Sequence, residues 1–182
     1  LLTLSASSTV GIGTNNPWGR LSVSSANLAQ EWQQIGSFLT ISGVSLPALS
    51  TLSPNRVALF DFTDRSLRTY EFQGSTWGAI GSGITIAGTG YSKLTTLSPN
   101  RVAFIDANES ILRTYEFNGS TWTQIGSNLT ISGAGLPALT ALSPNRVAFI
   151  DDENDSLSTY EFNGSSWSQI GSGISIATLS QP

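Results

Sequence analysis

Residues Tyr115–Trp122 read Tyr-Glu-Phe-Asn-Gly-Ser-Thr-Trp, and this stretch decides the fold because it recurs along the chain. Near-copies lie at Tyr70–Trp77 and Tyr160–Trp167, so the three tryptophans that end them are 45 residues apart. Trp32 extends the series by one step toward the N-terminus, and Ser-Pro-Asn-Arg recurs at the same spacing from Ser53, Ser98 and Ser143. A fixed period of this length is the signature of a repeat architecture.

Each repeat divides into four strand-like pieces. In the first clear repeat these are Leu46–Leu52, Asn55–Asp61, Ser66–Phe72 and the run from Trp77 to Ile86. No stretch of useful length has the 3.6-residue spacing of an amphipathic helix. Four strands per 45 residues is the pattern of a β-propeller blade, whose sheet is buried on both faces by its neighbours. We therefore expect an all-β propeller of four-stranded antiparallel blades.

The register of the second and third strands follows from the turn between them. Asp61 and Ser66 flank four turn residues, and if they pair, then Arg56 stands opposite Glu71. Val57–Tyr70 and Phe60–Leu67 become apolar pairs on opposite faces. The same count predicts the pairs Arg101–Glu116 and Arg146–Glu161. Asp61, Asp106 and Asp151 recur at the end of the second strand.

The repeats also define the domain boundaries. We expect an outer strand at about residues 30–43, blades at about 44–86, 87–131 and 132–177, and a C-terminal tail at 178–182. Leu1–Ala29 is either a degenerate first blade or an extended N-terminal arm. Self-association through strand edges or the N-terminal segment is expected in either case, and it is required if the segment is an arm, because three blades cannot close a ring alone.

Composition narrows the class of protein. Charged residues make up only 11% of the chain, against about a quarter in average proteins, and the net charge is −4. The polarity comes from Ser, Thr, Asn, Gln and Gly instead, which favours an extracellular setting (secreted, cell surface or virion). With no basic run, no nucleic-acid partner is expected. No apolar run approaches the ~18 residues of a membrane span.

The repeat residues resemble a known group of proteins. Val102–Asp106 and Leu112–Gly126 are similar to tandem propeller repeats of bacterial and phage-type secreted or surface proteins, including integrin-α-like and lectin-like propellers. The resemblance covers about Gln30 to Ala177 and implies a β-propeller outside the cell. The calcium loop of integrin-like blades is not reproduced in the turns after Asp61 and Asp106. Separately, Val10–Thr14 with Pro17 and Leu21–Val23 resembles a short segment of tail-fibre proteins.

The residue inventory excludes several chemistries. The chain has no His and no Cys, so a Ser-His-Asp triad, a cysteine nucleophile and a histidine-based zinc site are absent. The recurring carboxylates fall one per repeat in equivalent places, so they would not face one another as glycosidase pairs do. We expect no enzyme activity, no cofactor and no metal. The acidic turn Asp151–Asp155 could offer oxygen ligands to a hard cation, but an ordinary hairpin turn is the favoured interpretation.

The recurring Arg, Glu and Trp are the candidate binding residues. Arg and Glu can make charge-assisted hydrogen bonds to sugar hydroxyls, an aromatic ring can stack on a sugar, and small bladed fucose lectins use that combination between blades. The favoured interpretation, however, is a cross-strand ion pair with a core Trp between neighbouring blades. The candidates are Arg56, Glu71, Trp77, Arg101, Glu116, Trp122, Arg146, Glu161 and Trp167.

Two functions follow. The first is a non-enzymatic structural or interaction subunit of an extracellular assembly such as a fibre or virion appendage. The alternative is a multivalent carbohydrate-binding propeller that recognises a glycan or cell-surface receptor through sites between blades.

Overall fold

The computed structural model describes residues 2–6, 8–12, 33–87, 91–131 and 137–176. The chain divides into two units, Leu1–Ile35 and Gly36–Pro182. The first unit contains a two-stranded antiparallel hairpin, β1 (Leu2–Ala6) and β2 (Ser8–Ile12), with Leu2 opposite Ile12. The rest of the segment expected to be a first blade or an arm lies outside the described residues, as does Trp32.

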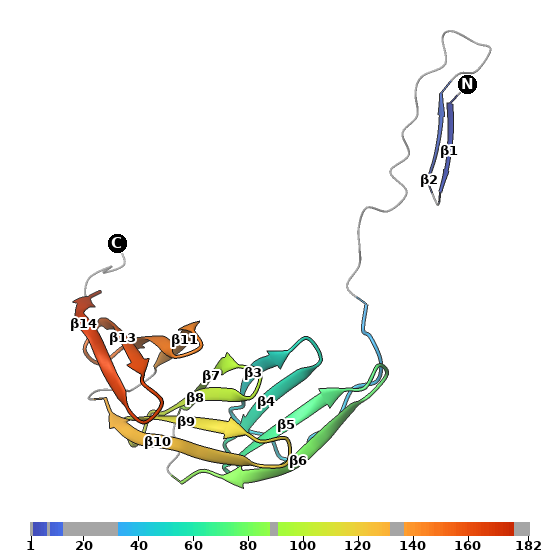
Figure 1. The fold of residues 1–182 in the computed structure, drawn as a ribbon. Helices are drawn as coiled ribbons and strands as arrows, with labels where there is room; N and C mark the ends of the chain where they lie inside the picture. The colour runs from blue at the N-terminus through green and yellow to red at the C-terminus, as the bar shows by residue number, and fades with distance from the viewer. Residues whose placement is uncertain (1, 7, 13–32, 88–90, 132–136, 177–182) are drawn as a thin grey trace. The chain divides into compact units, whose positions relative to one another are not determined.

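The second unit consists of three four-stranded antiparallel sheets, each formed by strands that follow one another in sequence (Figure 1). This is the expected all-β arrangement of blades. Blade 1 contains β3 (Ala48–Ser53), β4 (Arg56–Asp61), β5 (Ser66–Phe72) and β6 (Trp77–Thr85). Blade 2 contains β7 (Lys93–Ser98), β8 (Arg101–Asp106), β9 (Ile111–Phe117) and β10 (Trp122–Thr130). Blade 3 contains β11 (Ala138–Ser143), β12 (Arg146–Asp151), β13 (Ser156–Phe162) and β14 (Trp167–Ser175).

The predicted register is confirmed in all three blades. Arg56 pairs with Glu71, and the turn-flanking residues Asp61 and Ser66 pair with each other. The equivalent pairs are Arg101–Glu116 and Arg146–Glu161. The register holds because the turn has the same length in every repeat, and a slip of one residue would move all apolar side chains to the wrong face.

The turn between the second and third strands is built around the recurring aspartate. Asp106 is fully buried, and its Oδ1 accepts the backbone N–H groups of Asn108 (2.9 Å) and Glu109 (3.2 Å). Asp151 caps its own turn in the same way, at 3.0 and 3.2 Å. Each turn then ends on a non-glycine residue with a left-handed backbone, namely Arg65 (φ 57°), Ser110 (φ 54°) and Asp155 (φ 45°).

This backbone conformation predicts a stabilising substitution. We expect Ser110→Gly to raise the free energy of unfolding by about 0.5–1 kcal/mol, because glycine adopts positive φ without the steric penalty of a side chain. Chemical denaturation would measure the change. Thr123→Gly, in the extended backbone of β10, is the control and should destabilise by a similar amount; stabilisation by both would contradict the explanation.

Each blade presents two different faces, because side chains alternate along a strand. One face, here called the Trp face, carries Val57, Tyr70 and Trp77 in blade 1 and their copies in blades 2 and 3. The opposite face, here called the Arg–Glu face, carries the ion pair together with Ala58, Phe60, Leu67 and Thr69 and their copies.

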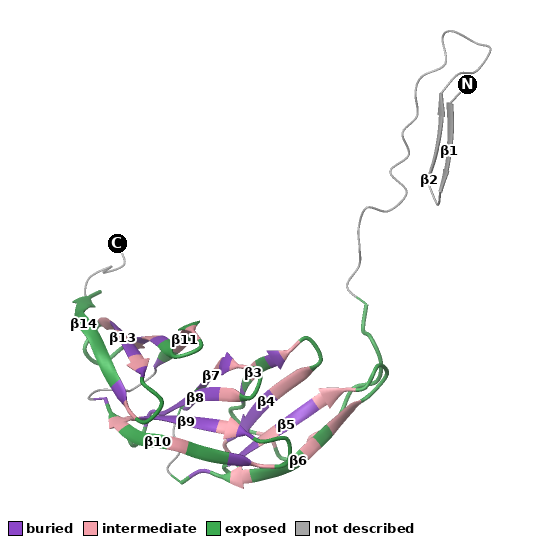
Figure 2. Cartoon of the chain, in the orientation of Figure 1, coloured by how far each residue is buried: buried purple, intermediate pink, exposed green. Residues whose placement is uncertain are grey.

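The two apolar cores lie where these unlike faces meet. Ala58, Phe60 and Leu67 of blade 1 pack against the Trp face of blade 2, and the rings of Phe60 and Phe104 lie 4.8 Å apart in an edge-to-face arrangement. Ala103, Ile105 and Leu112 of blade 2 pack in the same way against the Trp face of blade 3. Buried residues accordingly concentrate on the two middle strands of each sheet, whereas the outer strands β6, β10 and β14 are largely exposed (Figure 2).

A backbone contact fixes each outer strand to the next blade. Ser82 N–H donates to the carbonyl of Ser120 at 2.6 Å, and Ser127 N–H donates to that of Ser165 at 2.7 Å. Gly81, which precedes the first donor, has φ 65°, and a Cβ there would lie 2.3 Å from the Ser120 oxygen. The expected outer strand at residues 30–43 forms no strand over its described part, yet Ser37 N–H repeats the contact with Ser75 at 2.8 Å.

Candidate functional site

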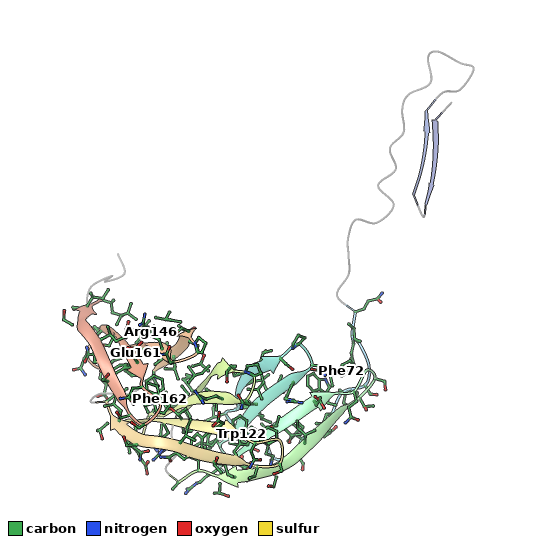
Figure 3. All side chains as sticks on the ribbon, viewed as in Figure 1. Phe72, Trp122, Arg146, Glu161 and Phe162 are labelled. Atoms are coloured by element: carbon green, nitrogen blue, oxygen red, sulfur yellow. The ribbon has the colours of Figure 1, made fainter. Side chains whose placement is uncertain are left out.

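The three Arg–Glu pairs are ion pairs at equivalent positions. Each joins an Arg Nη2 to a Glu Oε1, at 2.8 Å for Arg56–Glu71, 2.9 Å for Arg101–Glu116 and 2.7 Å for Arg146–Glu161. The first two pairs are half-buried between blades, and the third is more open, with side chains 44% and 38% exposed. In Figure 3 Arg146 and Glu161 lie next to each other on the last sheet.

Each pair leaves polar atoms unused. Among the described residues, no hydrogen bond reaches Oε2 of Glu71 or Glu116, and only one terminal nitrogen of each arginine is engaged. The Nε groups of Arg56 and Arg101 are buried without a partner in the described part of the chain. A fixed donor beside a fixed acceptor, both partly open to solvent, can bind a vicinal diol, which offers one acceptor and one donor.

The structure does not bring Arg, Glu and Trp of one repeat together. Trp122 pairs with Phe117, one residue along from Glu116, so it lies on the opposite face of its own sheet from Arg101 and Glu116. It faces blade 1 instead, where its indole N–H donates to Thr69 Oγ1 at 2.9 Å. Trp167 repeats this contact with Thr114 of blade 2 at 2.8 Å. Each tryptophan therefore lies against the Arg–Glu face of the preceding blade.

The burial of Trp122 and Trp167 determines their structural role. Trp122 is 1% exposed and Trp167 is 5% exposed, so neither offers a ring face to solvent. Each packs on the phenylalanine paired with it, with centroids 5.3 Å apart for Phe117–Trp122 and 5.2 Å for Phe162–Trp167. The interpretation of these two residues as core side chains between blades agrees with this geometry, whereas stacking of their rings on a sugar does not.

Trp77 differs from its two copies. It belongs to blade 1, whose Trp face has no complete sheet against it among the described residues, and it is only half-buried. An apolar cavity of about 500 Å³ opens on this face, lined by side chains that include Val57, Tyr70 and Trp77 together with Phe38 and Leu39. No described residue accepts a hydrogen bond from its indole N–H.

The acidic turn Asp151–Asp155 is a structural turn. Asp151 is 4% exposed and its two carboxylate oxygens accept hydrogen bonds from the turn itself, including one from Asn154 Nδ2 at 2.7 Å. Within the described ranges no group of three or more His, Cys, Asp or Glu side chains could hold a metal ion. No helix in the described part of the chain is long and apolar enough to cross a membrane.

Burial also raises the pKa of two tyrosines, Tyr115 and Tyr160. It raises the pKa of Tyr115 from the ordinary 10.0 to about 12, with a smaller contribution from the Asp106 and Glu109 carboxylates, while Arg113 acts in the opposite direction. An unfolded tyrosine ionises first as the pH rises. The contribution of Tyr115 to stability is therefore complete below pH 10 and is lost as the pH approaches 12.

This linkage predicts an alkaline dependence of stability. We expect the wild-type protein to lose about 1–2 kcal/mol of unfolding free energy from this residue as the pH rises above 10. Tyr115→Phe should lose less over the same range, because it has no phenol to ionise. Urea denaturation at successive pH values from 8 to 11.5 would measure both slopes. Equal slopes for the two proteins would contradict the assignment.

The fold and its site define a class: an all-β protein of tandem propeller blades with a polar ion pair on each blade. Among solved structures, the chain is similar to the Aleuria aurantia lectin bound to Fucα1-6GlcNAc, with a TM-score of 0.53 and 14% identity over 74% of this chain and 47% of that one. It is also similar to a protein from Lactobacillus plantarum, with a TM-score of 0.53 and 14% identity over 70% and 41% of the two chains.

The chain thus spans less than half the length of these structures. The Aleuria aurantia lectin is a six-bladed β-propeller. No protein-family model matches the sequence, and no curated protein matches it either. At such low identity the likeness establishes the propeller-type fold alone.

Proposed function

We propose that this chain is a non-enzymatic, extracellular, carbohydrate-binding propeller in which each blade presents its Arg–Glu pair to sugar hydroxyls. The observation that carries the proposal is the threefold recurrence of a fixed, partly open pair with an unused donor and an unused acceptor. Structural neighbours at TM-scores of at least 0.5 include a fucose-specific lectin, which supports the same chemistry. Repetition on three blades would provide multivalent attachment to a glycan-bearing surface.

The nine candidate residues then have different roles. Arg56, Arg101 and Arg146 donate to sugar oxygens, and Glu71, Glu116 and Glu161 accept from sugar hydroxyls. Trp122 and Trp167 position the sheets that carry the first two pairs, since their rings are buried. Trp77 alone keeps part of its ring open, and we assign it as an aromatic contact at the end of the row of blades.

A glycan array tests the proposal. The purified protein should bind a defined group of glycans, and the triple variant Glu71→Gln, Glu116→Gln and Glu161→Gln should bind at least tenfold more weakly. Its melting temperature should change by only a few degrees, because partly exposed ion pairs contribute at most about 1 kcal/mol each. Glu153→Gln makes the same chemical change in an exposed turn and should leave binding intact. An array without any bound glycan would overturn the proposal.

A second candidate, a structural or interaction subunit of an extracellular fibre or virion-type assembly, is favoured by the two outermost faces. The Trp face of blade 1 exposes an indole N–H donor, and the Arg–Glu face of blade 3 leaves Thr159, the counterpart of Thr69, half-exposed. Between blades, the indole N–H of Trp122 or Trp167 donates to the hydroxyl of Thr69 or Thr114. The indole of Trp77 and the hydroxyl of Thr159 are the matching donor and acceptor on the two outermost faces. Light scattering would reveal association; a monomer at high concentration would remove this candidate.

A further inference from the structure

Two clefts lie between adjacent blades, one repeat apart. The first has a volume of about 340 Å³ and lies between the end of β6 and the Trp face of blade 2. The second, of about 400 Å³, lies between the end of β10 and the Trp face of blade 3. Volumes of this size fall in the range of small-ligand sites. Neither cleft is lined by any of the nine Arg, Glu and Trp residues considered above.

The two clefts have the same construction. Tyr115 and Gln124 line the first, and their counterparts Tyr160 and Gln169 line the second. The opposite wall is the aliphatic end of the preceding outer strand, Ile84–Ile86 in the first cleft and Leu129–Ile131 in the second. Each cleft thus combines a polar wall with an aliphatic one, which suits a pyranose ring with its hydroxyl edge and its C–H face.

The polar wall of the first cleft contains atoms without partners. Arg113 is 7% exposed, and its Nη1 is buried beside Oδ2 of Asp106 at 3.7 Å, so this nitrogen is not offered to the cleft. No described residue forms a hydrogen bond with the Tyr115 hydroxyl. The Gln124 amide nitrogen donates to Asn128 Oδ1 at 2.8 Å, which holds the carboxamide in place and leaves its oxygen as an acceptor.

The charges around the first cleft favour a neutral ligand. The guanidinium of Arg113 forms an ion pair with Glu109 and lies beside the Asp106 carboxylate. Because two carboxylates lie beside one guanidinium, the net charge of this wall is negative, and binding of an anionic ligand is disfavoured. Ser158 replaces Arg113 in the second cleft, and Gln169 Nε2 lies 3.4 Å from its Oγ as a donor. A ligand common to both clefts must therefore be recognised through hydroxyl, amide and phenol groups.

We propose that these two clefts are saccharide-binding sites, each for one neutral hexose-sized unit and separate from the Arg–Glu pairs. This inference rests on the proposed carbohydrate-binding function and adds two sites to it.

Calorimetric titration of the full chain would test the clefts. The probes are methyl α-L-fucoside, methyl α-D-mannoside, methyl β-D-galactoside and N-acetylglucosamine, each at millimolar concentration. Gln124→Leu and Gln169→Leu are the variants, since both glutamines are exposed on outer strands and tolerate substitution without loss of the fold. We expect each substitution to remove one binding site per chain. Tyr115→Phe should weaken the same site by about tenfold.

The Glu71, Glu116 and Glu161 triple variant separates this inference from the proposed function. Retained monosaccharide binding in that variant, together with loss in the two glutamine variants, supports the clefts. Loss of all binding in the triple variant with no effect of the glutamine variants would overturn the clefts and leave the proposed function standing. If no probe and no arrayed glycan binds, both are overturned.

Discussion

Replacing Trp122 by alanine is expected to lower the free energy of unfolding by about 3–5 kcal/mol, the usual cost of removing a buried aromatic side chain from a core. The indole is 1% exposed, packs on Phe117 and joins the core between blades 1 and 2. Its removal would leave a cavity at a junction that cannot collapse easily, because both sheets are held by their own ladders. Chemical denaturation followed by circular dichroism would measure the loss.

Two further variants isolate the causes. Trp77→Ala removes the same residue from a half-buried position on an uncovered face and should cost much less, about 1–2 kcal/mol. Thr69→Val keeps the shape of the contact but removes the oxygen that accepts the indole N–H, so it should cost about 1–3 kcal/mol. If Trp77→Ala and Trp122→Ala destabilise equally, burial between blades is not the source of the effect.

Asp106→Ala is the second large effect, an expected loss of about 2–4 kcal/mol. The carboxylate is fully buried and caps two backbone N–H groups of a turn that is constrained by the left-handed Ser110. Its removal also leaves the buried Arg113 with Glu109 as its remaining ion-pair partner among the described residues. Thermal and urea unfolding would measure the loss of stability.

Asp106→Asn is the matched control for the turn. The carboxamide keeps an oxygen for the two backbone N–H groups but no longer offers a charge to Arg113. We expect Asp106→Asn to lower the free energy of unfolding by about half as much as Asp106→Ala does. A loss as large as that of alanine would mean that the charge matters and the cap does not, whereas no loss for either variant would contradict the structural role of the buried aspartate.

Much of this fold could be predicted from the sequence, for a physical reason. The 45-residue period reports a unit that must pack against copies of itself, so every side chain needed for packing recurs. The antiparallel register of Arg56 with Glu71 followed from counting residues across one short turn. Only the pairing rule and the turn length were needed, and neither depends on how the sheets are arranged.

The recurrence of Trp, Arg and Glu did not show which of them share a face, because periodicity reports which residues recur and not which face of the sheet they occupy. The information was present in the alternation of the strand, since Trp122 pairs with Phe117 and therefore lies opposite Glu116. The clefts were missed for another reason. Tyr115 and Gln124 also recur, at Tyr160 and Gln169, but their proximity to the preceding outer strand appears only after the blades are packed.

The backbone contact between each outer strand and the next blade has a consequence for how such chains evolve. The contact uses one backbone N–H and one backbone carbonyl, and it depends on glycine before the donor, as at Gly81 and Gly126. Any repeat can therefore supply the donor, and any repeat can supply the acceptor. A duplication or deletion of one whole 45-residue unit therefore recreates a compatible joint, whereas a break at any other length would not. The number of blades can thus change by whole units without a new interface between them.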